Sequence, residues 1–159
     1  TLVELLIVIV IIGILAAAML LSSSSATASA EASNIVSELR NLKAASMMFY
    51  SDSMDTINSG GANTVINTSG SAKTLLGKYM DNPEKISNLY LFKTTTYASL
   101  GRKWFVGYNL SNVTAEVKEK LAGKAKSTGL YSGSLAGAAG LAAGNQFTKD
   151  DSYVWMVAR

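Results

Sequence analysis

The sequence contains no cysteine and no histidine, a single proline, and charged residues at only 16% of its 159 positions. Without cysteine the chain has no disulfide, no thiolate nucleophile and no thiolate metal ligand. Without histidine it has no Ser–His–Asp triad, no imidazole base and no histidine-bound metal. The net charge of +3 is too small to indicate a nucleic-acid partner by itself.

The N-terminal end is one long apolar run. Residues 5–21 carry no charge and no hydrogen-bonding side chain, and the next charge after Glu4 is Glu31. A helix over residues 1–21 would span about 31 Å, which matches a bilayer core of about 30 Å. No Lys or Arg precedes the run, and it exceeds the roughly 7–15 apolar residues of a secretory signal. We therefore expect a retained transmembrane helix rather than a removed signal peptide.

Glu4 is the one ionisable side chain in this segment. A carboxylate at the edge of an apolar helix is costly and usually has a partner. The nearest basic side chain, Arg40, lies about 54 Å further along a straight helix, so we expect no partner within the helix. Two interpretations stay open. Glu4 lies among lipid headgroups, or it meets the α-amino group of another copy of the chain.

The first sixteen residues, TLVELLIVIVIIGILA, place this glutamate directly before an unbroken apolar stretch. They resemble the N-terminus of a mature type IV pilin, and they are equally similar to the major pseudopilins of type II secretion. Mature chains of this family normally begin with an N-methylated Phe before the Thr-Leu-Val-Glu stretch, and that residue is not in this sequence. The resemblance covers about one tenth of the chain.

The resemblance implies roles for individual residues. Glu4 matches the glutamate that pairs with a neighbouring subunit's N-terminus, and Gly13 matches the glycine near which the family helix loosens in the filament. Many pilins have a proline eight residues after that glycine, where this chain has Leu21. Since Gly costs a helix about 1 kcal/mol and Pro about 3, we expect weaker loosening or none. Packing in the filament core is implied for Leu5, Leu6, Ile7, Val8, Ile9, Val10, Ile11, Ile12, Ile14 and Leu15.

The resemblance also implies a function. The chain would be a structural subunit, stored in the inner membrane and polymerised through its N-terminal helix into an extracellular filament for attachment, motility or DNA uptake. Its partners would be copies of itself, inner-membrane lipid, a prepilin peptidase and a pilus assembly platform. We expect no enzymatic activity and no cofactor. The alternatives are a major pseudopilin of a type II secretion system and a membrane-anchored binding domain that never polymerises.

Beyond the apolar run, the pattern predicts that the same helix continues to about Ser53. Residues 22–32 are rich in Ser and Ala and lack Gly and Pro, which favours a helix over a flexible linker. Apolar residues then recur every three to four positions, which marks one face of an α-helix. The stripe comprises Ile35, Leu39, Leu42 and Phe49.

The rest of the chain predicts a small domain on this helix. Strand-forming residues fill 89–97, 103–110 and 152–158, and short helices are indicated over 72–80 and 114–126. Residues 58–71 indicate a polar loop, and 129–144 resist assignment. We therefore predict an α+β, pilin-like fold, with an antiparallel sheet of three or four strands on the C-terminal half of a long helix. Residues 1–32 form the membrane and filament-core part, and 33–159 the globular part. In the absence of a disulfide, we expect Trp104 and Trp155 to help hold the C-terminal end.

Charged residues outside the helix suggest two further sites. Asp52 with Asp55, and Asp150 with Asp151, are acidic pairs near loops, but Ca²⁺ needs six to eight oxygen ligands and few are visible. We predict no metal, with Asp150 and Asp151 as the calcium candidates, since some major pseudopilins bind calcium in a C-terminal loop. The basic residues Arg102 and Lys103, and the lysines of 114–126, indicate a solvated face, with weak DNA contact as the alternative. These lysines are Lys118, Lys120, Lys124 and Lys126.

Overall fold

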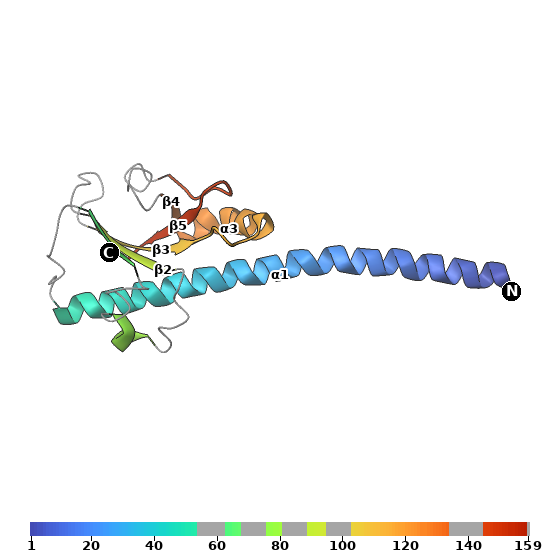
Figure 1. Ribbon diagram of the computed structural model, residues 1–159, viewed down its shortest axis with the longest axis horizontal. Coiled ribbons are helices and arrows are strands. Elements are labelled where there is room, and N and C mark those ends of the chain that lie inside the picture. The colour runs from blue at the N-terminus through green and yellow to red at the C-terminus, as the bar shows by residue number, and fades with distance from the viewer. Residues whose placement is uncertain (54–62, 68–75, 81–88, 95–102, 134–144, 159) are drawn as a thin grey trace.

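The computed structural model describes residues 1–53, 63–67, 76–80, 89–94, 103–133 and 145–158, which form a long helix carrying a small α+β head (Figure 1). This confirms the predicted fold class. The elements in chain order are α1 (Leu2–Ser53), β1 (Asn63–Asn67), the 3₁₀ turn η1 (Gly77–Tyr79), β2 (Leu89–Thr94), β3 (Lys103–Asn109), α3 (Ala115–Thr128), β4 (Leu130–Ser132) and β5 (Tyr153–Val157).

Helix α1 is continuous over 52 residues, through both Gly13 and the serine-rich segment. The hydroxyl groups of this segment bond to carbonyl oxygens of the preceding turn instead of interrupting the helix. Ser24 Oγ donates to Leu21 O at 3.1 Å, and Thr27 Oγ1 donates to Ser24 O at 2.8 Å. The prediction of a helix rather than a linker is therefore confirmed.

The sheet has five strands in the order β1-β2-β3-β5-β4, and every neighbouring pair is antiparallel. The prediction of three or four strands was therefore too low. The apolar pair Val65 and Ile66 lies within β1, where we expected only loop, and β4 lies in the unassigned 129–144 segment. Of the short helix predicted over 72–80, the structure describes residues 76–80, which contain the turn η1; residues 72–75 lie outside the described part.

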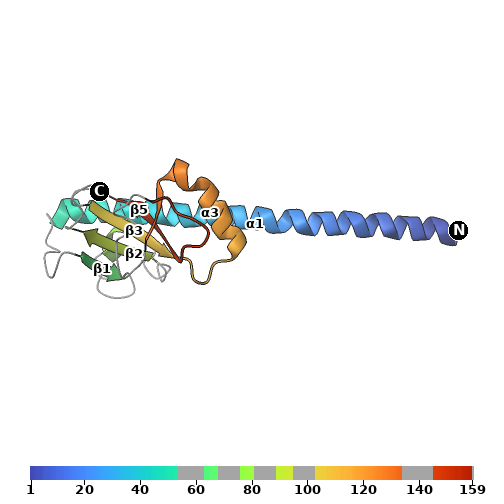
Figure 2. The same ribbon diagram turned by 90° about the horizontal axis from the view of Figure 1, so that it is seen from above.

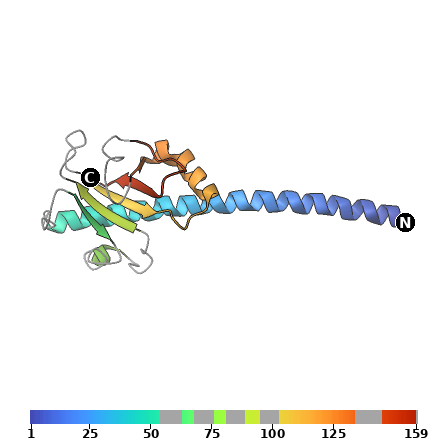
Figure 3. The same cartoon turned by 45° about the horizontal axis from the view of Figure 1, so that its top comes forward.

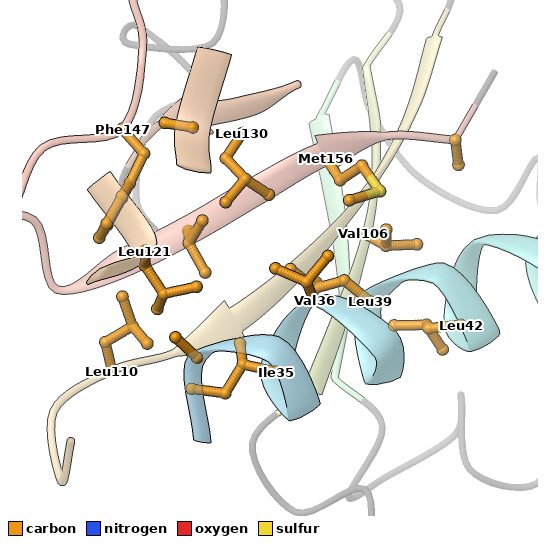
Figure 4. Packing of buried hydrophobic residues seen from close by; sticks show 14 of the residues in the cluster. Ile35, Val36, Leu39, Leu42, Val106, Leu110, Leu121, Leu130, Phe147 and Met156 are labelled. Atoms are coloured by element: carbon orange, nitrogen blue, oxygen red, sulfur yellow. The ribbon is translucent and has the colours of Figure 1, made fainter. Parts of the chain in front are cut away.

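The core lies between the sheet and the C-terminal half of α1, and Figure 4 shows the side chains of both interleaved there. Leu39 and Leu42 of α1 are fully buried, as is Val106 of β3. Alternate residues of β3 and β5 point to opposite faces of the sheet. Val106, Val154 and Met156 therefore face the helix, while Phe105 and Trp155 are buried on the other face.

Helix α3 packs across α1 at the edge of the head nearest the N-terminus (Figure 2). Its buried face consists of Val117, Leu121 and Ala125. The facing residues of α1 include Ala28 and Ala32, whose small side chains let the two helices approach closely. Contact between α1 and the head thus begins before residue 33. Thr114 is the N-cap residue of α3 but makes no side-chain capping bond.

Candidate assembly interface

The N-terminal half of α1 projects from the head as a bare apolar rod (Figure 3). The exposed fraction is 68% for Leu5, 65% for Ile14 and 76% for Leu21. Fifteen large apolar side chains between Leu2 and Leu21 are exposed, and no residue before Ala28 belongs to the core. Burying one such side chain is favourable by about 1.5–3 kcal/mol of free energy, so transfer of the rod from water to an apolar environment is strongly favourable.

All ten residues predicted to pack in a filament core lie on this rod and are exposed. None of them contacts the described part of the head, so the fold leaves the whole surface of the rod free for another partner. Gly13 also lies there, and apart from its chain neighbours and the nearby helix backbone no heavy atom lies within 4 Å of the place where a Cβ would be. The helix does not loosen at Gly13 in the single chain. Loosening in a filament stays a prediction.

Glu4 forms an ion pair with the α-ammonium group of Thr1 in the same chain. The expectation that Glu4 has no partner within the helix was therefore wrong. That expectation considered only Lys and Arg side chains and left out the α-amino group of Thr1. The two groups are 84% and 78% exposed, and ion pairs this exposed contribute little to stability in water. The ammonium and the carboxylate are thus both accessible to a second molecule.

The four lysines of α3 do not form one open patch. Lys120 and Lys126 are exposed, while Lys118 and Lys124 are half-buried. Lys124 turns toward α1, where its Nζ donates a hydrogen bond to Ser33 Oγ at 2.6 Å. The exposed residues Glu116 and Glu119 lie among the lysines on the same helix. The side chains of Arg102 and Lys103 lie outside the described residues. This mixed surface favours the solvated-face interpretation over DNA contact.

Asp151 serves as a hydrogen-bond acceptor within its own loop. Its carboxylate accepts from Thr148 N at 2.8 Å, Thr148 Oγ1 at 2.9 Å and Ser132 Oγ at 2.7 Å. These bonds tie the turn before β5 to strand β4. The adjoining Asp150 is exposed. Among the described residues, no group of three or more acidic side chains, His or Cys comes together as a metal site.

Asp52 likewise has a local role at the end of α1. Its Oδ2 accepts a hydrogen bond from Tyr79 Oη at 2.7 Å, which fastens the turn η1 to the helix. This bond, together with burial and the charge of Asp52, raises the pKa of Tyr79 above its ordinary value. The ring of Tyr79 also meets Phe49 edge-on, with 6.2 Å between centroids. Asp55, the other member of the predicted pair, lies outside the described residues.

Sequence reasoning missed a basic cavity of about 390 Å³ on the side of α1. Arg40 and Lys43 line it, and neither forms an ion pair within the described part of the chain. The available signal was their spacing, because residues three apart lie on the same side of a helix. The other lining residues are Thr128, Gly129, Tyr131, Met156 and Val157.

Comparisons with protein-family models, curated proteins and solved structures found no match to this chain. The chain is an α+β head built on the C-terminal half of a long N-terminal helix. Among the described helices, α1 is the one that is long and apolar enough to cross a membrane.

Proposed function

We propose that this chain is the structural subunit of a type IV pilus filament, stored in a membrane and polymerised through the N-terminal half of α1. The observation that carries the proposal is the bare apolar rod between Leu2 and Leu21. Such a rod is stable in only two surroundings, the hydrocarbon of a bilayer and a bundle of other apolar helices. The inner membrane supplies the first and copies of the same chain supply the second.

The placement of the head is compatible with a bundle of rods. The sheet and α3 pack on the C-terminal half of α1, so they leave the rod clear on all sides. The heads then form the outer layer of a filament whose centre consists of α1 helices. The resemblance of the first sixteen residues to type IV pilins supports the same arrangement, with the filament on the bacterial surface.

Glu4 gives the bundle a defined axial register. A carboxylate moved into an apolar bundle requires a positive partner, because an unpaired charge in a low dielectric is strongly unfavourable. In the single chain that partner is the α-ammonium group of Thr1. In the filament we assign the role to the N-terminus of a neighbouring subunit. One charged residue in an otherwise apolar rod thereby disfavours every register that leaves it unpaired.

The variant Glu4→Ala tests this assignment, with Glu116→Ala as the control because Glu116 is an exposed carboxylate on the head. We expect Glu4→Ala to accumulate in the membrane fraction with a folded head but to give at least about tenfold fewer sheared filaments. The control should give the normal number. Wild-type filament yield from Glu4→Ala would refute the pairing role.

A major pseudopilin of a type II secretion system would have the same rod and register. The two functions differ in the length of the assembly, since a pseudopilus is short and piston-like. Electron microscopy of cells that express the chain at its natural level distinguishes them. Long surface filaments support the pilus, and their absence together with a secretion defect on deletion supports the pseudopilus. A chain that never polymerises would be a membrane-anchored binding domain.

A further inference from the structure

Helix α1 carries opposite charges on the two flanks of its buried stripe. Successive residues of an α-helix are rotated by about 100° around the helix axis. Measured in this way from the buried Leu39, Glu31 lies about 80° to one side and Arg40 about 100° to the other. Glu38 falls on the side of Glu31, and Lys43 on the side of Arg40. One flank of the helix is thus acidic and the other basic.

The described part of the head covers these flanks unequally. Ser33, whose Oγ accepts a hydrogen bond from Lys124 of α3, lies about 120° around the helix axis from Leu39, on the same side as Arg40. Helix α3 therefore leans over the basic flank, while Glu31 on the opposite flank is exposed. Glu31 makes no ion pair within the described part of the chain.

The basic flank of α1 also borders a cavity. The cavity of about 390 Å³ opens beside Arg40 and Lys43, between α1 and the junction of α3 with β4. Tyr131 also lines the cavity, together with the apolar residues Met156 and Val157. None of the described residues that line the cavity is acidic. It therefore suits a carboxylate on a side chain whose methylene groups can lie against an apolar wall.

We propose that the cavity receives Glu31 of a second copy of the chain, which pairs there with Arg40 and Lys43. This inference rests on the proposed polymerisation. The donor and the acceptor lie on different surfaces, so the contact is head-to-tail. Such a contact gives a ring if the rotation between neighbours closes and an open helical filament if it does not. An open filament keeps an unused Glu31 at one end and an unused cavity at the other.

The contact specifies an axial offset between neighbours. Glu31 of one parallel helix lies level with Arg40 of another when the two are displaced by nine residues, about 13.5 Å, and with Lys43 at twelve residues, about 18 Å. A helical polymer gives each subunit several neighbours at different offsets, so the Glu4 contact can involve a different neighbour. Charge complementarity of this kind mainly sets partner orientation and register.

Charge reversal tests the pairing. We expect Glu31→Lys, and separately Arg40→Glu with Lys43→Glu, to lower filament yield by about tenfold, because each places like charges in contact. The triple variant restores the pairing with inverted signs and should recover most of the yield. Lys120→Glu with Lys126→Glu is the matched control, since both lysines are exposed on α3 and the charge change is the same. Wild-type yield from either reversal, or a triple variant no better than the reversals, overturns the proposal.

Crosslinking tests the proximity directly, because the natural chain has no cysteine. In filaments of Glu31→Cys with Arg40→Cys, a short bifunctional thiol reagent should yield dimers, trimers and longer ladders. Glu31→Cys with Lys126→Cys should not. If crosslinking of the first pair gives monomers alone, the contact is contradicted, even if the charge reversals lower filament yield. If the unsubstituted chain forms no filaments, the proposed polymerisation is wrong. If it forms filaments and the charge-reversal variants form them equally well, only the proposed Glu31 contact is wrong.

Discussion

The indole ring of Trp155 occupies the space where a side chain at Gly107 would project. The two residues are directly paired across β3 and β5, on the face of the sheet away from α1. A Cβ placed on Gly107 would lie 2.5 Å from both Cε3 and Cζ3 of the indole, closer than nonbonded carbon atoms approach. Trp155 is 1% exposed. The glycine is required here because strand β3 must leave room for the indole ring of its neighbour in β5.

Gly107→Ala should therefore destabilise the head by about 1–3 kcal/mol, the usual cost of overpacking. Denaturant unfolding in detergent, followed by tryptophan fluorescence, measures this loss. The additional change Trp155→Leu should make the Gly107→Ala substitution less costly, because the two sites are coupled. Gly123→Ala on α3 is the control, since no atom apart from its chain neighbours and the nearby helix backbone lies within 4 Å of its Cβ position. An equal loss at both glycines would contradict the account.

Ala32→Leu should disrupt the packing of α3 against α1. Ala32 is completely buried beneath α3, and a larger side chain would force the helices apart at a cost of about 1–3 kcal/mol. Ala30→Leu adds the same atoms on the exposed side of the helix and should leave the unfolding midpoint nearly unchanged. Thermal unfolding by circular dichroism compares the two variants, and an unchanged midpoint for Ala32→Leu would exclude this packing.

Asp151→Ala should loosen the C-terminal loop, because the turn before β5 loses three hydrogen bonds to one carboxylate. We expect a loss of about 1–3 kcal/mol in unfolding free energy and faster hydrogen exchange at Thr148 N. Asp150→Ala removes an exposed carboxylate and should change stability by no more than about 0.5 kcal/mol. Matching exchange rates at Thr148 in the two variants would argue against the bonds.

The contact between Tyr79 and Asp52 predicts a dependence of stability on alkaline pH. The folded-state pKa of Tyr79 is raised above the unfolded value of about 10. Its stabilising contribution is therefore complete below pH about 10 and disappears as the pH rises through the raised folded pKa. Tyr79→Phe removes both the bond and its pH dependence. Urea unfolding of the two proteins should give midpoints that differ at neutral pH and converge in alkali; a constant difference would contradict this.

The parts of the fold that the sequence predicts are those with long periodic patterns. Helices α1 and α3 follow from spacing, because each has a buried face of three or more residues. Strands β3 and β5 follow from runs of strand-forming residues, each with at least three consecutive buried positions. Strand β4 was missed because its three residues are too few to show an alternation. Strand β1 was missed because Val65 and Ile66 are surrounded by Asn and Thr.

The candidate interface was predictable in part. The rod and Glu4 are visible in the sequence because they need no tertiary structure. The basic cavity was not, since it forms only where the junction of α3 with β4 approaches Arg40 and Lys43. The close approach of Trp155 to Gly107 depends on the register of β3 with β5, which the sequence leaves open. Both features combine residues that are far apart along the chain.

Reconstruction of filaments sheared from cells that express the chain tests the central claim most directly. We predict a filament built from this chain, with residues 5–15 of α1 buried at its centre and Glu4 within ion-pair distance of a neighbouring N-terminus. The heads should surround this centre, with the sheet on the outside. Recovery of the chain only as single membrane-anchored molecules, or filaments with these residues exposed at the surface, would contradict the account.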